Sequence, residues 1–195
     1  MTKLRTFIAV PLPENIKTEI AAMTENFIHE FSSTINLTSI RWVNRENLHL
    51  TLIFLGEVTV DFVDESQKIV EQVAKTYKSF NIQLKGLGVF PNMHSARVLW
   101  IGIKDDANNI IKIQKLLVDS LMAIGYKPEE RKFHPHVTIA RFKIIHTNEI
   151  KDKLSKILKI NYESTIFPID SLILFKSTLT PDGPIYEVVK KFKLV

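Results

Sequence analysis

The sequence predicts an α+β fold in which most strand pairing is antiparallel. Runs rich in β-branched and aromatic residues occur in mixed order with amphipathic helical runs, unlike the regular alternation of a parallel sheet. Turn sequences at 91–94 and 181–184 separate consecutive β runs, as in antiparallel hairpins. A helix followed by a strand carrying His-x-Thr occurs once in each half, which predicts two similar lobes facing a cleft.

The first half begins with an apolar strand and an amphipathic helix. Pro13 followed by Glu14 is typical of a helix start, and apolar residues recur at helical spacing from Ile16 to Phe27. This helix should end near residue 29. The elements expected next are an extended segment over 37–43, a turn over 44–47, a strand over 48–55 that Gly56 closes, and a helix over 60–77.

The second half repeats a similar set of elements. Gly125 is a natural stop for the helix expected before it. The predicted elements are strands over 80–90 and 96–103, a helix over 107–124, a strand over 136–142, a helix over 149–158, and strands over 164–177 and 186–194.

The composition limits the possible chemistry. At 195 residues and 45% hydrophobic, the chain can bury one sizeable core, so we expect a single bilobal domain over 1–195. It contains no cysteine, which excludes disulfides, thiolate nucleophiles and cysteine-ligated metals. The net charge of +5 favours phosphate-bearing ligands. No signal peptide or membrane-length apolar run is apparent, so we expect a cytoplasmic protein without membrane attachment.

The two His-x-Thr triplets are the strongest functional signal. Residues i and i+2 of a strand point to the same face, so His49 projects with Thr51, and His136 projects with Thr138. Two histidines that titrate near neutral pH can act as base and acid, and threonine hydroxyls can donate to phosphoryl oxygens. The alternative is that these are ordinary half-buried strand residues.

The segments around both triplets resemble a known family. The chain is similar to the 2H phosphoesterase superfamily, and within it to the bacterial and archaeal RNA 2′,3′-cyclic phosphodiesterases, which are also described as LigT-like 2′-5′ RNA ligases. The segments that carry this resemblance are Arg5-Thr-Phe-Ile-Ala-Val, Asn47-Leu-His-Leu-Thr-Leu-Ile-Phe-Leu-Gly56, Ala96-Arg-Val-Leu-Trp100 and His134-Pro-His-Val-Thr-Ile-Ala-Arg141.

The resemblance implies a fold, an activity and residue roles. Two pseudo-symmetric, mostly antiparallel sheets with outer helices should surround a central cleft. The activity would be a metal-independent hydrolysis of RNA or nucleoside 2′,3′-cyclic phosphates to 2′-phosphomonoesters, with reversible 2′-5′ RNA ligation as a possible second reaction. His49 would be the proton donor and His136 the proton acceptor, while Thr51 and Thr138 would hold phosphate oxygens. No cofactor, metal or obligate protein partner is implied.

Other polar and aromatic residues are candidates for binding the substrate. Arg141 follows the second triplet and is a candidate phosphate ligand. Arg41 and Arg97 lie in apolar strands, where their side chains should face the cleft or solvent, and Phe7 is a candidate for stacking on a nucleobase. His134 shares strand parity with His136, but no third metal ligand is indicated, so we predict no metal site.

Two alternatives to RNA 2′,3′-cyclic phosphate hydrolysis remain open at this point. The same two-histidine chemistry could serve a 2′-5′ oligoadenylate or another small nucleotide, such as a cyclic nucleotide. In the other alternative, the cleft binds RNA ends without turnover. Loss of a motif residue would indicate a binding module, and all four motif residues are present.

Overall fold

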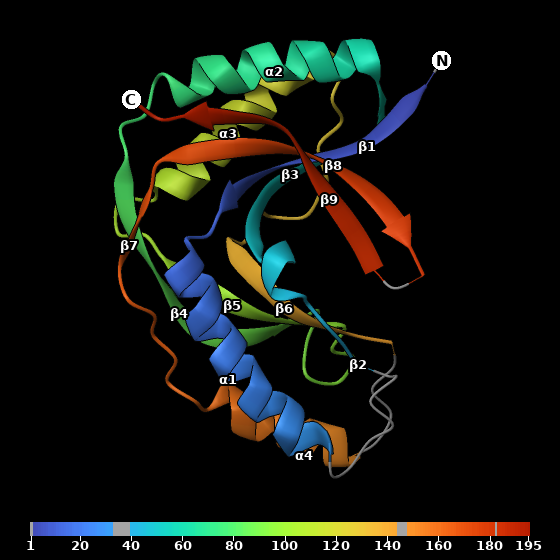
Figure 1. The fold of residues 1–195 in the computed structure, drawn as a ribbon, viewed down its shortest axis with the longest axis vertical. Helices are drawn as coiled ribbons and strands as arrows, with labels where there is room; N and C mark the ends of the chain where they lie inside the picture. Colours follow the sequence, from blue (N-terminus) through green and yellow to red (C-terminus); the bar gives the residue numbers. More distant parts are fainter. Residues whose placement is uncertain (1, 33–39, 144–147, 182) are drawn as a thin grey trace.

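The fold is built around one sheet of nine strands (Figure 1). The computed structural model describes residues 2–32, 40–143, 148–181 and 183–195. Every strand pair in it is antiparallel. The strands are β1 (Lys3–Pro11), β2 (Ile40–Trp42), β3 (His49–Thr59), β4 (Phe80–Phe90), β5 (Val98–Lys104), β6 (His136–Phe142), β7 (Phe167–Ile169), β8 (Ser171–Thr180) and β9 (Gly183–Lys193).

The strand order divides the sheet into two halves. The order is β7-β4-β5-β6-β3-β1-β8-β9, and β2 also pairs with β6. We call β3, β1, β8 and β9 the His49 half, and β6, β5, β4, β7 and β2 the His136 half. The halves meet where Leu50 of β3 pairs with Val137 of β6. The two expected sheets are therefore continuous through this junction, and the predicted α+β class is confirmed.

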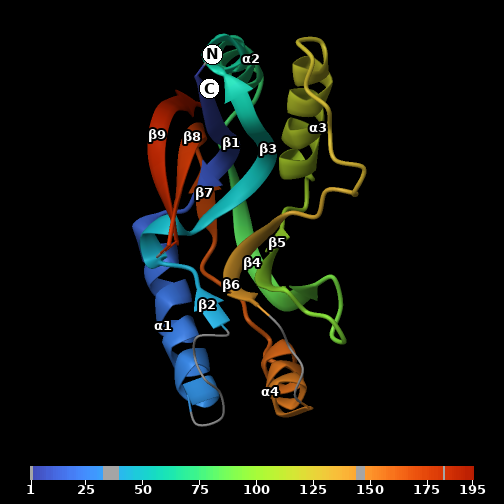
Figure 2. The same cartoon turned by 90° about the vertical axis from the view of Figure 1, so that its right-hand side faces the viewer.

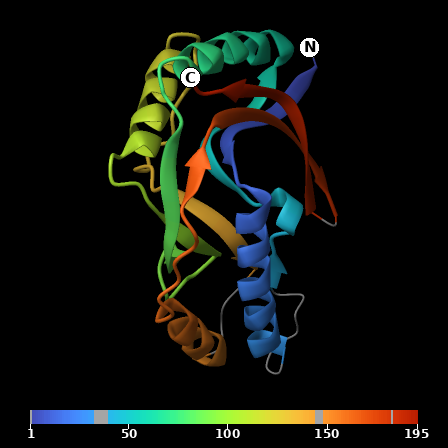
Figure 3. The same cartoon turned by 60° about the vertical axis from the view of Figure 1, so that its left-hand side comes forward.

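Among the described residues, the α-helices are α1 to α4. The helices α2 and α3 lie at one end of the molecule, and α1 and α4 lie toward the other (Figures 1 and 3). The helix α2 packs on β1, β3, β8 and β9, and α3 packs on α2 and β3. At the opposite end, α1 contacts α4, and α4 contacts β4. Both chain termini lie near α2 (Figure 1). The bounds are α1 (Glu14–Ser32), α2 (Val60–Ala74), α3 (Asn109–Met122) and α4 (Asn148–Leu158), and a short 3-10 turn, η2 (Arg45–Asn47), precedes β3.

The last long β run differs most from the sequence prediction. One strand was expected over 164–177, but the chain forms β7, passes Asp170, and then forms β8. β7 pairs with β4 and β8 pairs with β1, so the two strands lie in different halves of the sheet. The apolar pattern is continuous because both strands are buried, and it does not reveal the change of partner.

Gly56 does not end β3 as expected. The strand continues to Thr59, and Gly56 has a φ of 78°. The register changes there, because Thr6 pairs with Gly56 and Phe7 pairs with Phe54. An extra residue in one strand is a β-bulge, for which a glycine at positive φ is well suited. The glycine therefore marks a bend inside the strand. Of the extended segment expected over 37–43, residues 40–42 form β2, and 37–39 lie outside the described residues.

Candidate active site at the sheet junction

The junction between the two halves brings both sequence motifs together. Leu50 and Val137 are fully buried, so they face the core. Side chains alternate along each strand, and the residues that flank this pair therefore point to the other face. Each of these residues is half-buried. They are the four motif residues His49, Thr51, His136 and Thr138.

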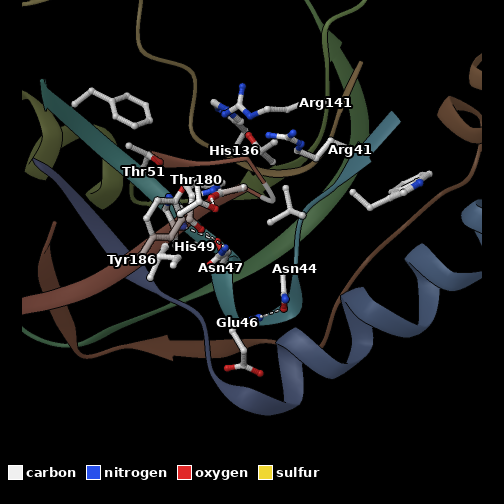
Figure 4. A pocket seen from close by; sticks show the side chains of 17 residues that line it. Arg41, Asn44, Glu46, Asn47, His49, Thr51, His136, Arg141, Thr180 and Tyr186 are labelled. Carbon is white, nitrogen blue, oxygen red and sulfur yellow. Dashed lines mark hydrogen bonds between the residues drawn. The ribbon is translucent and has the colours of Figure 1, made fainter. Parts of the chain in front are cut away.

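All four motif residues line one cavity of about 450 Å³ (Figure 4). Both halves contribute to its walls, through β3 and β6. The remaining wall residues come from β2, the turn around η2, and the hairpin between β8 and β9. Besides the motif residues, the lining consists of Arg41, Trp42, Val43, Asn44, Glu46, Asn47, Phe54, Arg141, Thr180, Gly183, Pro184, Ile185 and Tyr186.

The two histidine rings are held in the same way. Nδ1 of His49 lies 2.7 Å from the carbonyl oxygen of Asn47, and Nδ1 of His136 lies 2.7 Å from that of His134. A carbonyl oxygen only accepts hydrogen bonds, so each Nδ1 carries the donated proton. In the neutral ring, Nε2 is then the unprotonated nitrogen. Each histidine therefore has Nε2 available either to accept a proton or, once protonated, to donate one.

Aromatic side chains support both imidazoles. Phe7 lies 4.9 Å from His49 and Tyr186 lies 5.3 Å from it, measured between ring centroids. On the other side, Phe90 lies 5.0 Å from His136 and Trp100 lies 6.2 Å away. These contacts restrict how far each ring can turn and help to fix the direction of its Nε2.

Two of these aromatic contacts have further consequences. Gly88 pairs with Trp100, and a Cβ atom at Gly88 would come within 2.2 Å of the indole, so glycine leaves the space that the ring occupies.

Phe7 is only 1% exposed. The expectation that Phe7 stacks on a nucleobase is therefore wrong, because its ring faces are already covered by protein. Its contact with His49 gives it a positioning role instead.

Burial makes both histidines weaker bases than usual. The pKa of His49 is lowered to about 4, mainly by burial and to a smaller extent by Arg141 and His136, while the hydrogen bond to Asn47 opposes the shift. Burial also lowers the pKa of His136, with smaller contributions from the charges of His134 and Arg141 and an opposing effect of the hydrogen bond to the His134 carbonyl. Both rings are therefore neutral at neutral pH in the empty site. A bound anion would oppose these shifts and favour a protonated ring.

The predicted arginines separate into two groups. Arg41 and Arg141 pair across β2 and β6 and line the cavity, as Figure 4 shows. The guanidinium of Arg41 also donates to the carbonyl of Pro181 over 3.3 Å. Arg97 does not line this cavity, and its guanidinium donates to the carbonyl of Lys143. The structure thus places Arg41 and Arg141 beside the histidines and leaves Arg97 outside this cavity.

Two residues of the cavity, from the turn around η2 and from the β8–β9 hairpin, were not predicted from the sequence. Tyr186 on β9 contacts the His49 ring, and burial raises the pKa of Tyr186, so its hydroxyl is neutral. Asn47 donates from Nδ2 to the carbonyl of Pro184 over 3.0 Å, which ties the turn before β3 to the β8–β9 hairpin. Asn47 could have been suspected from its place just before His49. No comparable signal marks Tyr186, because it reaches the site only through the pairing of distant strands.

His134 does not line this cavity. Its side chain is exposed, and its ring lies 4.8 Å from that of Trp100. In the described part of the chain, no three His, Asp or Glu side chains are grouped closely enough to hold a metal ion. Within the same ranges, no helix is both long and apolar enough to cross a bilayer.

Comparison with known proteins identifies the family. A family model described as the 2′-5′ RNA ligase superfamily matches residues 12–179. This chain belongs to that superfamily. The resemblance seen in the motif segments is thereby confirmed.

Several relatives match nearly the whole chain. A protein of Methanocaldococcus jannaschii is 38% identical over 190 residues, which cover 97% of this chain and 100% of the relative. One of Thermotoga maritima is 34% identical over 188 residues, covering 95% and 93%. Both relatives carry the name RNA 2′,3′-cyclic phosphodiesterase.

Solved structures of related proteins share the fold. The protein TT0787 of Thermus thermophilus superposes with a TM-score of 0.78 at 24% identity and covers 98% of both chains. E. coli LigT in its apo form gives a TM-score of 0.73 at 23% identity, covering 100% of this chain and 99% of LigT. The curled antiparallel sheet with its flanking helices is therefore the architecture that this superfamily member shares with LigT.

The lowered histidine pKa values predict a pH-dependent loss of stability. Below about pH 6.5 the unfolded chain binds protons that the folded His49 excludes, so the free energy of unfolding should fall as the pH drops toward 4. Its neutral, buried ring contributes stability that is fully present above pH 6.5. In urea titrations between about pH 7 and pH 4, the free energy of unfolding should decrease less in His49→Gln than in the wild type. The difference between the two decreases should be up to about 3 kcal/mol.

The matched control is His94→Gln, which removes an exposed histidine that does not line the cavity. Its stability should follow that of the wild type across the same range. A pH dependence of His49→Gln that is as steep as the wild type's would contradict the burial of a neutral ring at position 49.

Proposed function

We propose that the chain hydrolyses RNA or nucleoside 2′,3′-cyclic phosphates to 2′-phosphomonoesters by general acid/base catalysis with two histidines. The observation that carries this proposal is the equivalent placement of His49 and His136, each with Nδ1 bound to a carbonyl and Nε2 left available, beside two arginines. The names of the relatives support the substrate class. A LigT structure in complex with 3′-AMP supports a site that accepts a nucleotide.

The chemistry needs one proton acceptor and one proton donor. His136 would take a proton from water through Nε2 while the water oxygen attacks phosphorus. The P–O3′ bond would break, and His49 would give a proton to the departing O3′. The hydroxyls of Thr51 and Thr138 and the guanidinium of Arg141 would donate to the nonbridging oxygens, where negative charge increases in the transition state.

The substrate itself would set the correct protonation state. His49 is neutral in the empty site at pH 7, yet a proton donor must be charged. The cyclic phosphodiester is an anion, and its charge next to an imidazole raises the pKa of that ring. Binding and protonation are therefore coupled: the buried pair acquires a proton in the presence of the ligand that needs it.

Ligation through a 2′-5′ linkage is a second candidate, which the superfamily assignment favours. The same pair would deprotonate a 5′-hydroxyl of RNA in place of water, and O3′ would again leave with a proton from His49. No change of residue roles is required. The partner would be a second RNA end, and the protein would need no nucleotide cofactor because the cyclic phosphate already stores the bond energy.

The first test is turnover of a nucleoside 2′,3′-cyclic phosphate by purified protein in excess EDTA. Turnover should persist, because threonine, arginine and protonated histidine supply the charge stabilisation without a metal. His49→Ala and His136→Ala should each reduce kcat/KM by at least about 100-fold, since each removes one proton-transfer partner. Thr51→Ala and Thr138→Ala should have smaller effects.

The control is His94→Ala, which removes an exposed histidine and should retain wild-type turnover. Circular dichroism of each variant would show whether the fold is kept. Near-normal turnover in a folded His49 or His136 variant would contradict the two-histidine mechanism. Complete inactivation by EDTA that one divalent ion reverses would contradict metal independence.

The second test is the position of the phosphate in the product. Protonation of O3′ by His49 breaks the P–O3′ bond, so adenosine 2′,3′-cyclic phosphate should give 2′-AMP. Chromatography against 2′-AMP and 3′-AMP standards distinguishes the two products. A predominance of 3′-AMP would show that the leaving oxygen is O2′, and that the roles given to the two histidines do not fit the substrate's orientation.

A further inference from the structure

A second cavity of about 880 Å³ adjoins the candidate active site. It shares Thr51, Phe54 and His136 with the first cavity, so two of the four motif residues, Thr51 and His136, lie where the two cavities meet. Its other walls come from the base of the β4–β5 hairpin, one face of α3, and the segment that links α3 to β6. Figure 2 shows this segment leaving α3 and running past β3 to β6.

Phe54 forms the boundary between the two cavities. Its neighbours Ile53 and Leu55 are buried, whereas Phe54 is 48% exposed. The ring leans on Phe7 with centroids 5.8 Å apart, and Tyr126 donates from its hydroxyl to the carbonyl of Phe54 over 3.2 Å. The position is therefore fixed while much of the ring remains uncovered. A large exposed aromatic ring beside a phosphate site is suited to stacking on a base.

The second cavity is also rich in basic groups. Lys115 of α3 and Arg131 and Lys132 of the following segment line it and are exposed, whereas Glu129 is the acid that lines it. Across the described ranges, none of these three cations forms an ion pair with an Asp or Glu. Cations that the protein leaves uncompensated are available to an anionic ligand.

We propose that the second cavity binds single-stranded RNA beyond the reacting nucleotide. The inference rests on the proposed function, which places the cyclic phosphate between the two histidines. A nucleoside cyclic phosphate has one phosphate, so it leaves the cations of the second cavity without a partner. Only a longer chain brings further phosphates to Lys115, Arg131 and Lys132. Aromatic surface interleaved with uncompensated cations is the surface that single-stranded nucleic acids bind.

The bound chain has two possible sources with the same chemistry. It is either the continuation of the strand that carries the cyclic phosphate, or the 5′-hydroxyl end of a second strand. Nucleophile and leaving group lie on opposite sides of phosphorus in an in-line displacement. The second cavity adjoins the first at Thr51 and His136, on one side of the phosphate site, and could hold either strand. The experiment therefore needs one arm for each source.

The first arm compares two substrates in the same enzyme variants. For a tetranucleotide ending in a 2′,3′-cyclic phosphate, Arg131→Ala/Lys132→Ala should lower kcat/KM about tenfold, whereas hydrolysis of a nucleoside 2′,3′-cyclic phosphate should stay within about twofold of wild type. The slope of log kcat/KM against log salt for the tetranucleotide should become shallower by about 0.7 for each phosphate contact that is lost. Lys115→Ala should act in the same direction.

The matched control is Lys112→Ala, which removes an equal charge one turn earlier on α3, outside the cavity lining. It should leave kcat/KM for both substrates unchanged.

The second arm uses a 5′-hydroxyl tetranucleotide without a cyclic phosphate as an inhibitor of nucleoside cyclic phosphate hydrolysis. If inhibition weakens in Arg131→Ala/Lys132→Ala, the cavity takes the second strand; if only the first arm responds, it takes the strand that carries the cyclic phosphate.

Fluorescence anisotropy with a labelled tetranucleotide tests the same cavity independently of turnover. Wild type should bind more tightly than Arg131→Ala/Lys132→Ala even if no cyclic phosphate is hydrolysed, so failure of the proposed function and failure of this inference are distinguishable. The inference is overturned if the double variant matches wild type in binding and in both arms. Equal losses for the tetranucleotide and the mononucleotide would also overturn it.

Discussion

Leu50 of β3 and Val137 of β6 form the register pair that joins the two halves of the sheet. Because the strands run antiparallel, the pairing imposes a local two-fold relation on the residues that flank it. Each histidine therefore has equivalent surroundings: a carbonyl two residues earlier in the chain and an aromatic ring from the neighbouring strand, Phe7 of β1 for His49 and Trp100 of β5 for His136. The site is thus a consequence of how the halves of the sheet meet, and both buried side chains of the pair lie directly beneath it.

The chemistry follows from the depth at which this junction places the imidazoles. Burial favours the neutral rings, and Arg141 adds a positive charge that further lowers both pKa values. An anionic ligand opposes the lowering of these pKa values in two ways: it pairs with the charge of Arg141, and it favours protonation of one ring. A near-symmetric pair of weak bases can in this way become one acid and one base, and the orientation of the bound phosphodiester decides which is which.

Sequence patterns predicted the motif strands well, because alternation along a strand is a local property: His49 and Thr51 share a face whatever the neighbouring strand is. Features that depend on which strands pair could not be predicted from the sequence. The apolar pattern around Asp170 shows two buried strands but not that they lie in different halves. Arg97 lines the second cavity instead of the first and donates to the carbonyl of Lys143, and the ring of Phe7 is covered by protein. Tertiary packing decides what each strand face contacts, so neither outcome could be predicted from the sequence.

Nitrogen NMR of the two imidazoles measures directly where each ring carries its proton, with His49→Gln and His136→Gln used to assign the signals. In the ligand-free protein at neutral pH, both rings should be neutral and carry their proton on Nδ1, and addition of 2′-AMP should raise the pKa of at least one of them. A proton on Nε2 of either neutral ring, or a charged imidazolium in the empty site at pH 7, would contradict the account.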